Sequence, residues 1–389
     1  LLVQRLLEAG ADVNLIGGDY CTALQAASRD GYDVIVHILL QHGANVNVQG
    51  GSFGSALRAA AVGGHPRVVE MLCEAKAEVE GGLQMACLGG HQAVAEILLA
   101  RGADLNGSSE GLDTPLQAAM AGRHHSLARW LLEKGARATD SSGIRGTSLQ
   151  LAALAGEAEL VDIFLEQGAN PWKKNDRLDT KVIEKLGIKL PTGGYPTYPI
   201  VLAVAGGHSQ VVTRLLDALP PNVFTSSDHN DRRSDQSDTA RSRPKYALRS
   251  ALCMALDTSH ETVVNLLLDR DVPFDLATVE HACRVSKPSV VISLLKMRDP
   301  LTSEQDRYRN GIRAISKAAL HKRLGVVELL LPLAIQSERF VPTDLEEALQ
   351  NAVSCKDLET VNKLLHCGAS PTIQSDPLWQ SDLADEHEE

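Results

Sequence analysis

Aromatic residues are scarce in this 389-residue chain, at 4%, although 44% of its residues are hydrophobic. Alanine, leucine and valine supply the apolar material instead, which is typical of closely packed helices and argues against a β-sandwich or barrel. No apolar run reaches the roughly 18 residues of a membrane-spanning helix. Basic residues are also fewer than acidic residues, with 38 Lys and Arg against 49 Asp and Glu. The net charge of −11 argues against a general nucleic-acid binder, which must neutralise phosphates, but it leaves room for a local basic patch.

No two of the seven cysteines form a CxxC pair, and their number is odd. Most lie in apolar helical stretches, so buried free thiols are expected. Free thiols fit a reducing compartment, and we predict a cytoplasmic protein, with the nucleus as the other location. The chain begins at Leu1 inside a helical pattern, without a methionine or a signal-like leader, so we expect a fragment of a longer protein.

Two short strings recur along the chain. Strings of the form Leu-Leu-x-x-Gly-Ala-Asp-Val-Asn occupy residues 6–14, 39–47 and 98–106. Their glycine returns every 33 residues, and one shortened unit carries Lys76 in its place. Strings of the form Thr-Pro-Leu-Gln-Ala-Ala precede these endings at residues 22–27, 55–60, 114–119 and 147–152, and Gly-His pairs stand at residues 64–65, 90–91 and 207–208. Such a period indicates stacked units, none of which buries its apolar face alone.

In order, composition and period, these strings resemble the ankyrin family, whose repeat reads Thr-Pro-Leu-His-x-Ala-Ala, Gly-His, Leu-Leu and Gly-Ala-Asp-Val-Asn. Gln or Arg stands here at the usual His position of the first string. The resemblance implies an all-α ankyrin-repeat solenoid of helix-turn-helix units with short β-hairpin-like fingers. It is strong as far as Trp172 and weaker beyond, over about eleven units.

Individual positions of the repeat carry structural expectations. Thr114 should cap the first helix of its unit, and the glycine of each Gly-Ala-Asp-Val-Asn string should adopt the left-handed conformation that ends the second helix. His65, His91 and His208 are expected to hold loops together by hydrogen bonds between neighbouring units. Structural use explains these histidines better than metal ligation, because no ligand-like spacing of His or Cys occurs.

The repeats also define the expected domain organisation. Two interruptions are polar, and the second cannot bury enough apolar surface to fold. Within it, residues 232–238 leave phosphorylation open as an alternative to a plain linker. The expected parts are ankyrin repeats at 1–172, an insertion loop at 173–197, a divergent repeat at 198–222, a disordered polar linker at 223–245, further divergent repeats at 246–374, and an acidic tail at 375–389.

Enzyme motifs are missing or otherwise explained. The chain contains no Gly-Lys dipeptide, which excludes a Walker A loop within these residues, and no HExxH. Residues 50–54 match the GxSxG of α/β-hydrolases, but that motif needs a strand before it and a helix after it. The register of the repeat already accounts for the string. We predict no catalytic residue, no cofactor, no metal site and no enzymatic activity.

Ankyrin proteins bind partners on the concave face formed by the finger tips and the first helices, and the resemblance carries this surface over to matching positions. The tips and the positions before the Gly-His pairs give these predicted partner-binding residues: Asp19, Tyr20, Arg29, Asp30, Ser52, Phe53, Leu88, Glu110, Asp113, Ile144 and Arg145. Tyr20, Phe53, Leu88 and Arg145 are the expected anchors, because large apolar groups and Arg dominate interfaces. Most other groove positions are small or apolar, which favours a smooth, mildly hydrophobic groove. Leu88 and Leu154 either face this groove or complete the packing between units.

We predict a monomeric protein–protein interaction scaffold that binds a protein partner through the concave groove, without nucleic-acid or membrane partners. The alternative is the C-terminal sensor region of a larger STAND/NACHT-type signalling ATPase, because the glycine-rich residues 49–60 resemble the ankyrin arrays of fungal NACHT-type proteins. An enzyme within these residues is the weakest hypothesis.

Overall fold

The structure is a computed structural model that describes residues 2–108, 113–138, 146–173, 197–219, 242–270, 272, 274, 276–285, 287–296, 304–337 and 340–370. The chain divides into two compact units, Leu1–Ala247 and Leu248–Glu389. In the described residues all regular structure is helical, apart from isolated bridge residues: Gly50 pairs with Gly54, and Gly146 is a further one. The predicted all-α solenoid is therefore confirmed.

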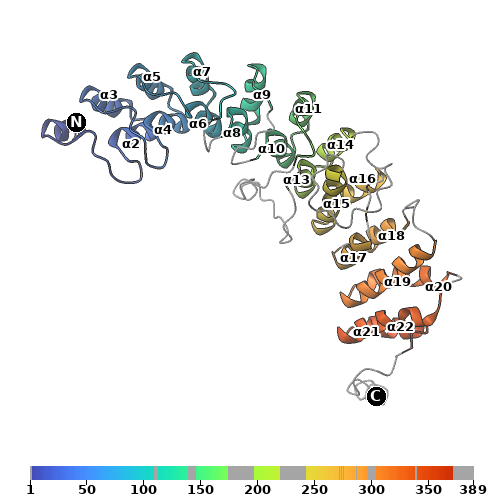
Figure 1. The fold of residues 1–389 in the computed structure, drawn as a ribbon. Helices are drawn as coiled ribbons and strands as arrows, with labels where there is room; N and C mark the ends of the chain where they lie inside the picture. The colour runs from blue at the N-terminus through green and yellow to red at the C-terminus, as the bar shows by residue number, and fades with distance from the viewer. Residues whose placement is uncertain are drawn as a thin grey trace. The chain divides into compact units, whose positions relative to one another are not determined.

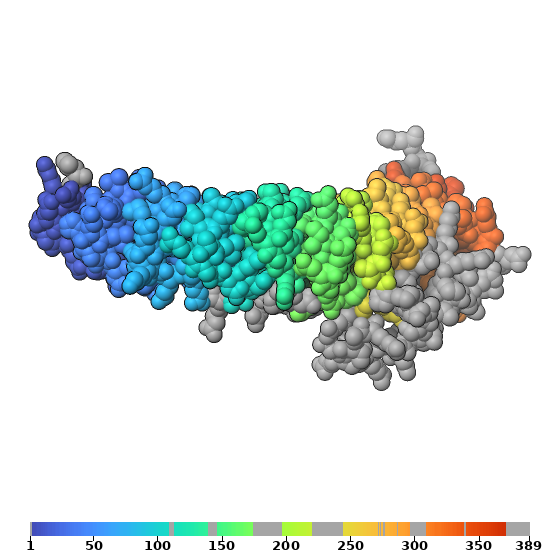
Figure 2. Space-filling view, turned by 90° about the horizontal axis from the view of Figure 1, so that it is seen from above, coloured from blue at the N-terminus to red at the C-terminus, as the bar shows by residue number. Residues whose placement is uncertain are grey.

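The first unit is a double row of short helices (Figure 1). One row consists of the first helices of the repeats: α2 (Ala23–Asp30), α4 (Ala56–Gly63), α6 (Gly82–Gly89), α8 (Pro115–Ala121), α10 (Ser148–Ala155) and α13 (Pro199–Ala205). The other row consists of the second helices: α1 (Leu2–Glu8), α3 (Asp33–Gln41), α5 (Pro66–Glu74), α7 (Gln92–Ala100), α9 (His125–Glu133), α11 (Ala158–Glu166) and α14 (Ser209–Asp217). First helices pack on one another and on their own second helices. The repeats therefore follow in chain order as bands along the surface of this unit (Figure 2).

Capping side chains and glycines set the ends of these helices. Hydroxyl groups of Thr22, Ser55, Thr114 and Thr147 each accept a hydrogen bond from the backbone N–H three residues later, which confirms the predicted cap. The expected glycine conformation is also present: Gly10, Gly43, Gly102, Gly135 and Gly168 have φ between 82° and 97°. These local signals explain why each helix spans only about two turns.

Small side chains in the first helices allow the repeats to approach closely. Ala59, Ala60 and Ala61 of α4 are all 0% exposed, and α4 packs against both α2 and α6. A larger side chain at these positions would force the helices apart and strain the core. The Ala-Ala pair of the sequence pattern is thus a packing element.

Lys76 occupies a left-handed position, with φ 63°, where the other repeats have glycine. For a residue with a Cβ atom, this backbone conformation costs roughly 1–2 kcal/mol. Replacing Lys76 with Gly is expected to raise the free energy of unfolding by about 1 kcal/mol, as measured by urea denaturation. Lys76→Ala is the control, because alanine keeps the Cβ atom and should give no such gain. Equal stability of the two variants would contradict the strain argument.

The second unit repeats the same arrangement with weaker sequence signals. Its first helices are α17 (Leu276–Val285), α19 (Glu304–Leu320) and α21 (Glu346–Ser354), and its second helices are α16 (Glu261–Asp269), α18 (Pro288–Lys296), α20 (Leu324–Ile335) and α22 (Leu358–His366). A 3-10 helix, η2 (Pro342–Leu345), precedes α21. Neighbouring helices pack within each row, as α17 does on α19 and α20 does on α22.

Helix α15 (Ser242–Asp257) contains the boundary between the units. The polar linker was expected to extend to residue 245, so its last four residues are helical instead. Pro244 lies in the first turn of the helix, where its missing N–H has no helical partner to lose. Residues 174–196 of the insertion, 220–222 of the divergent repeat, 223–241 of the linker and 371–389 at the C-terminal end lie outside the described residues.

All seven cysteines are free, as predicted. Cys21, Cys87 and Cys283 are buried and the other four are partly exposed, so burial is less general than expected. Burial raises the pKa of the Cys87 and Cys283 thiols to about 12. Both therefore act as small apolar core groups. No described helix is long and apolar enough to cross a membrane.

Candidate partner-binding surface

In the Thr-Pro-Leu-Gln-Ala-Ala strings, the side chain at the Gln position hydrogen-bonds to the backbone of the fingers. Amide groups of Gln25, Gln84 and Gln117 donate to the backbone carbonyls of Val48, Gly107 and Gly146 over 2.9–3.0 Å. Arg58 does the same with Glu80 over 3.1 Å, and Gln150 with Thr197. Each first helix thus holds the backbone that leads into the next repeat, a role that the sequence analysis did not assign.

The histidines of the Gly-His pairs link neighbouring repeats, as predicted. Nε2 of His65, His91 and His208 lies 3.0–3.1 Å from the backbone carbonyls of Arg29, Val62 and Leu154. A carbonyl oxygen only accepts hydrogen bonds, so Nε2 carries the proton. Asparagines form a third link at the other end of the repeat: Nδ2 of Asn14 donates to Gly43 over 3.2 Å and its Oδ1 accepts from the N–H of Asn45 over 2.7 Å. We call these three series the hydrogen-bond ladders.

Five predicted partner-binding residues meet at the first two fingers. The rings of Tyr20 and Phe53 stack with centroids 6.0 Å apart and an interplanar angle of 16°. Cζ of Arg29 lies 5.4 Å from the centre of the Phe53 ring. The carbonyl of Asp19 accepts hydrogen bonds from both the backbone N–H of Ser52, at 2.9 Å, and its hydroxyl, at 3.2 Å. We call these five residues the finger cluster.

Two glycines allow the fingers to approach so closely. A Cβ atom on Gly50 would lie 2.9 Å from Sγ of Cys21, and one on Gly51 would lie 2.8 Å from the backbone of Tyr20. Both glycines also have positive φ, 143° and 68°. The turn they form is closed by a 2.8 Å hydrogen bond from Gly50 N–H to the Gly54 carbonyl. The Gly-rich string at residues 50–54 therefore has a structural role, which fits the interpretation that it is a repeat element.

On the side where the groove is expected, most of the exposed surface of the described first helices of the first unit lies over α2, α4 and α6. Val62, Met85 and Leu88 are partly exposed there. Every residue of α8 and α13 is buried, as is α10 from Ser148 to Leu154. Ala121 and Ala205, at the ends of α8 and α13, are 5% and 7% exposed and present almost no surface. Leu154 is 0% exposed, so it completes packing, whereas Leu88 keeps some exposed surface.

The remaining predicted residues fall into three classes. Asp30 is exposed at the end of α2. Asp113 is 1% exposed and stands directly before the helix cap Thr114, and its place in the partner site stays a prediction. A carboxylate is favoured at that place by the positive end of the helix dipole. Glu110, Ile144 and Arg145 lie outside the described residues.

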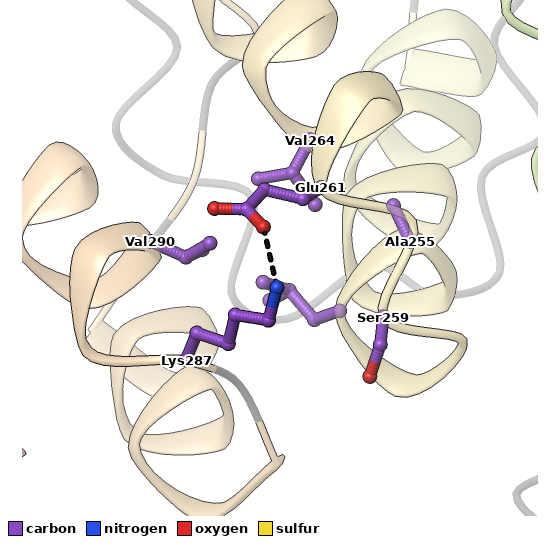
Figure 3. Close-up of a pocket in the computed structure, with 7 residues that line it drawn as sticks. Ala255, Ser259, Glu261, Val264, Lys287 and Val290 are labelled. Carbon is purple, nitrogen blue, oxygen red and sulfur yellow. Dashed lines mark hydrogen bonds and ion pairs between the residues drawn. The ribbon is translucent and has the colours of Figure 1, made fainter.

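A small pocket in the second unit shows no comparable potential (Figure 3). Lys287 Nζ spans it to reach Glu261 Oε2 at 2.9 Å, and the Ser289 hydroxyl donates to Glu261 over 3.2 Å. These hydrogen bonds lower the pKa of the Glu261 carboxyl and raise the pKa of the Lys287 amine. The Glu261 and Lys287 charges are already paired with each other. The residues around this pocket are therefore best explained as joining α16 to α18.

The sequence profile described as ankyrin repeats (three copies) matches residues 1–81 and 83–175. The matched residues, somewhat less than half of the chain, are ankyrin repeats. Its finger cluster and most of the hydrogen-bond ladders lie within the matched residues. A search of curated protein sequences finds no match. One solved structure that it is similar to is the human ASB11 ankyrin repeat domain, with 24% sequence identity over 65% of this chain and 100% of that chain and a TM-score of 0.44.

Proposed function

We propose that this protein binds a protein partner through the finger cluster and the groove beside it. Ankyrin repeats are generally protein–protein interaction modules. The observation that carries the proposal is the convergence of Tyr20, Phe53 and Arg29, from two repeats, into one surface cluster. Aromatic and Arg side chains are the residues that most often dominate binding energy.

The finger cluster is held in place before any partner arrives. Tyr20 is 40% exposed, yet its ring is stacked on Phe53 and its backbone lies against Gly51. Ordering of side chains is one of the main costs of association, and a rigid surface reduces that cost. This preorganisation supports a binding role for the cluster.

The chemistry of the surface indicates what would fit it. Val62, Met85 and Leu88 offer partly exposed apolar surface. Asp19, within the cluster, and Asp30, next to Arg29 in the chain, are exposed acidic residues. A helix or extended segment with an apolar anchor and a flanking Lys or Arg would complement both features. The proposed partner is therefore a protein segment of this composition.

Replacing Tyr20 and Phe53 together with Ala tests the proposal. Peptides selected from a random display library on the full chain serve as the probes. We expect the double variant to bind them about 30-fold more weakly, since loss of a central aromatic pair typically removes about 2 kcal/mol or more. Fluorescence anisotropy measures the affinity, and the melting temperature should fall only slightly because the cluster lies at the surface.

Tyr32→Ala is the matched control, because Tyr32 is another exposed aromatic of the same unit, 55% exposed, outside the cluster. Its variant should bind the selected peptides as the unaltered chain does. Equal binding by all three proteins would rule out the finger cluster as the partner site.

A further inference from the structure

One segment of this acidic chain is strongly basic. Residues 309–323, at the end of α19 and in the turn that follows it, include Arg309, Arg313, Lys317, His321, Lys322 and Arg323, and no Asp or Glu. The first four recur at every fourth position, so they project from one side of the helix. We call Arg309, Arg313, Lys317 and His321 the basic stripe. It stands out because the whole chain has a net charge of −11.

Packing of α19 leaves the stripe at the surface. Ala314, Ile315, Ala318 and Ala319 are 0% exposed and form the buried side of the helix, which packs against α17, α20 and α21. Arg309, Arg313 and His321 are exposed, and Lys317 is partly exposed. The sequence therefore places four consecutive basic positions where no core contact requires them.

The register of the repeat puts the stripe on the side that faces a partner in the first unit. Lys322, with φ 54°, stands at the position of Gly31, with φ 74°. His321 and Lys317 then correspond to Asp30 and Ala26, the groove-facing positions of α2. In Figure 1, α19 lies between α17 and α21 in the row of first helices of the second unit. At these two positions the first unit carries Asp30 and the uncharged Ala26, whereas the second unit carries His321 and Lys317.

Pairing distinguishes the stripe from other basic residues of this unit. Lys287 and Lys363, on the second-helix side, each pair with a glutamate of the preceding repeat over 2.9 and 2.8 Å. Among the described residues, Arg309, Arg313 and Lys317 form no ion pair. Exposed cations that stabilise no neighbour are available to an external anion.

Further cations strengthen the positive field at the end of the stripe. Nε of Arg323 donates to the carbonyl of Arg284 over 2.9 Å, which brings a residue of α17 next to the turn. Burial, followed by the charges of Arg284, Lys317 and Arg323, lowers the pKa of His321. The lowered pKa leaves His321 mainly neutral near pH 7, so the positive charge of the stripe comes from Arg309, Arg313 and Lys317.

We propose that the basic stripe is a second interaction surface, which docks a segment of a partner protein rich in Asp and Glu. The stripe extends over thirteen residues, from Arg309 to His321. Its ends are about 18 Å apart at a rise of 1.5 Å per residue, which matches a short acidic helix. Glu280 and Glu347 lie on α17 and α21, the two first helices that pack against α19. The net charge of −11 opposes a long phosphate backbone as the ligand. The surface is independent of the finger cluster and therefore extends the proposed function.

The experiment measures binding of a fluorescein-labelled helical peptide, about four turns long, with Glu at every fourth position to match the stripe. A peptide with Gln in place of Glu is the neutral probe, and a labelled DNA duplex is the nucleic-acid probe. The full chain should bind the Glu peptide in preference to both. Raising the salt from about 50 to about 300 mM should weaken this binding, since the screening length shortens. Arg309→Glu with Arg313→Glu should weaken it about tenfold or more.

The matched control is Arg101→Glu with Arg137→Glu, two exposed arginines of the first unit that give the same change in net charge. Unaltered melting temperatures show that both double variants fold. Equal loss of binding in the two double variants would overturn the proposal, because general charge would then explain the effect. Equal binding of the Gln peptide, or stronger binding of the duplex, would overturn it as well.

Discussion

Replacing Gly64 with Ala is expected to lower the free energy of unfolding of the first unit by about 3 kcal/mol or more. Gly64 has φ 75°, so a side chain is strained there from the start. A Cβ atom would also lie 2.4 Å from the His91 ring, which must then move and give up its hydrogen bond to the Val62 carbonyl. Strain contributes roughly 1–2 kcal/mol, and the lost bond and displaced ring contribute the rest.

Gly43→Ala provides the matched comparison. Gly43 has φ 82°, close to that of Gly64, but its added Cβ atom would meet nothing within 4 Å. This variant should therefore lose only the roughly 1–2 kcal/mol of backbone strain. Urea denaturation followed by circular dichroism measures both. If the two variants lost equal stability, the contact between His91 and the preceding repeat would contribute nothing.

Phe164→Ala is expected to cost about 3–5 kcal/mol, the usual range when a large core aromatic is truncated. Phe164 is 0% exposed and lies on α11, which packs against α10 and α14. In a linear array, stability is approximately a sum of terms within repeats and between neighbours. Hydrogen exchange should therefore accelerate most in α10, α11 and α14, and least in α2 and α4.

Phe53→Ala is the corresponding control, because it removes the same side chain from the surface cluster. We expect it to change exchange in the first unit only slightly. A uniform loss of protection from α2 to α14 in Phe164→Ala would show that the unit unfolds as one block, and the linear description would then be wrong.

Much of the fold was predictable because local chemistry repeats at a fixed period. Thr114 and Gly43 have the conformations that their residue types favour, and His65 and His91 form the expected bonds between repeats. The stack of Tyr20 on Phe53 was also within reach of the sequence, since the two residues are one 33-residue period apart. The same tip position in adjacent repeats falls side by side in a solenoid.

Other features depend on what covers a surface, which periodicity does not report. Asp113 has the composition of an exposed tip but is buried. Leu88 and Leu154 occupy equivalent positions in their repeats, yet only Leu88 keeps exposed surface. Sequence register assigns a residue to a face of a helix, and tertiary neighbours then decide whether that face is open. The sensor role of a larger signalling ATPase stays a prediction, because the structure and the comparisons leave it untested.

The hydrogen-bond ladders share one property: their side-chain donors bond to backbone carbonyls of the neighbouring repeat. His65 bonds to the carbonyl of Arg29, His91 to that of Val62 and Gln84 to that of Gly107, and the identity of the accepting residue plays no part in these bonds. A repeat that keeps its own His, Gln and Asn can therefore form these bonds with any repeat that keeps the glycine and the small residues at the contact. Duplication, deletion or shuffling of such repeats would change the binding surface and preserve the contacts between units.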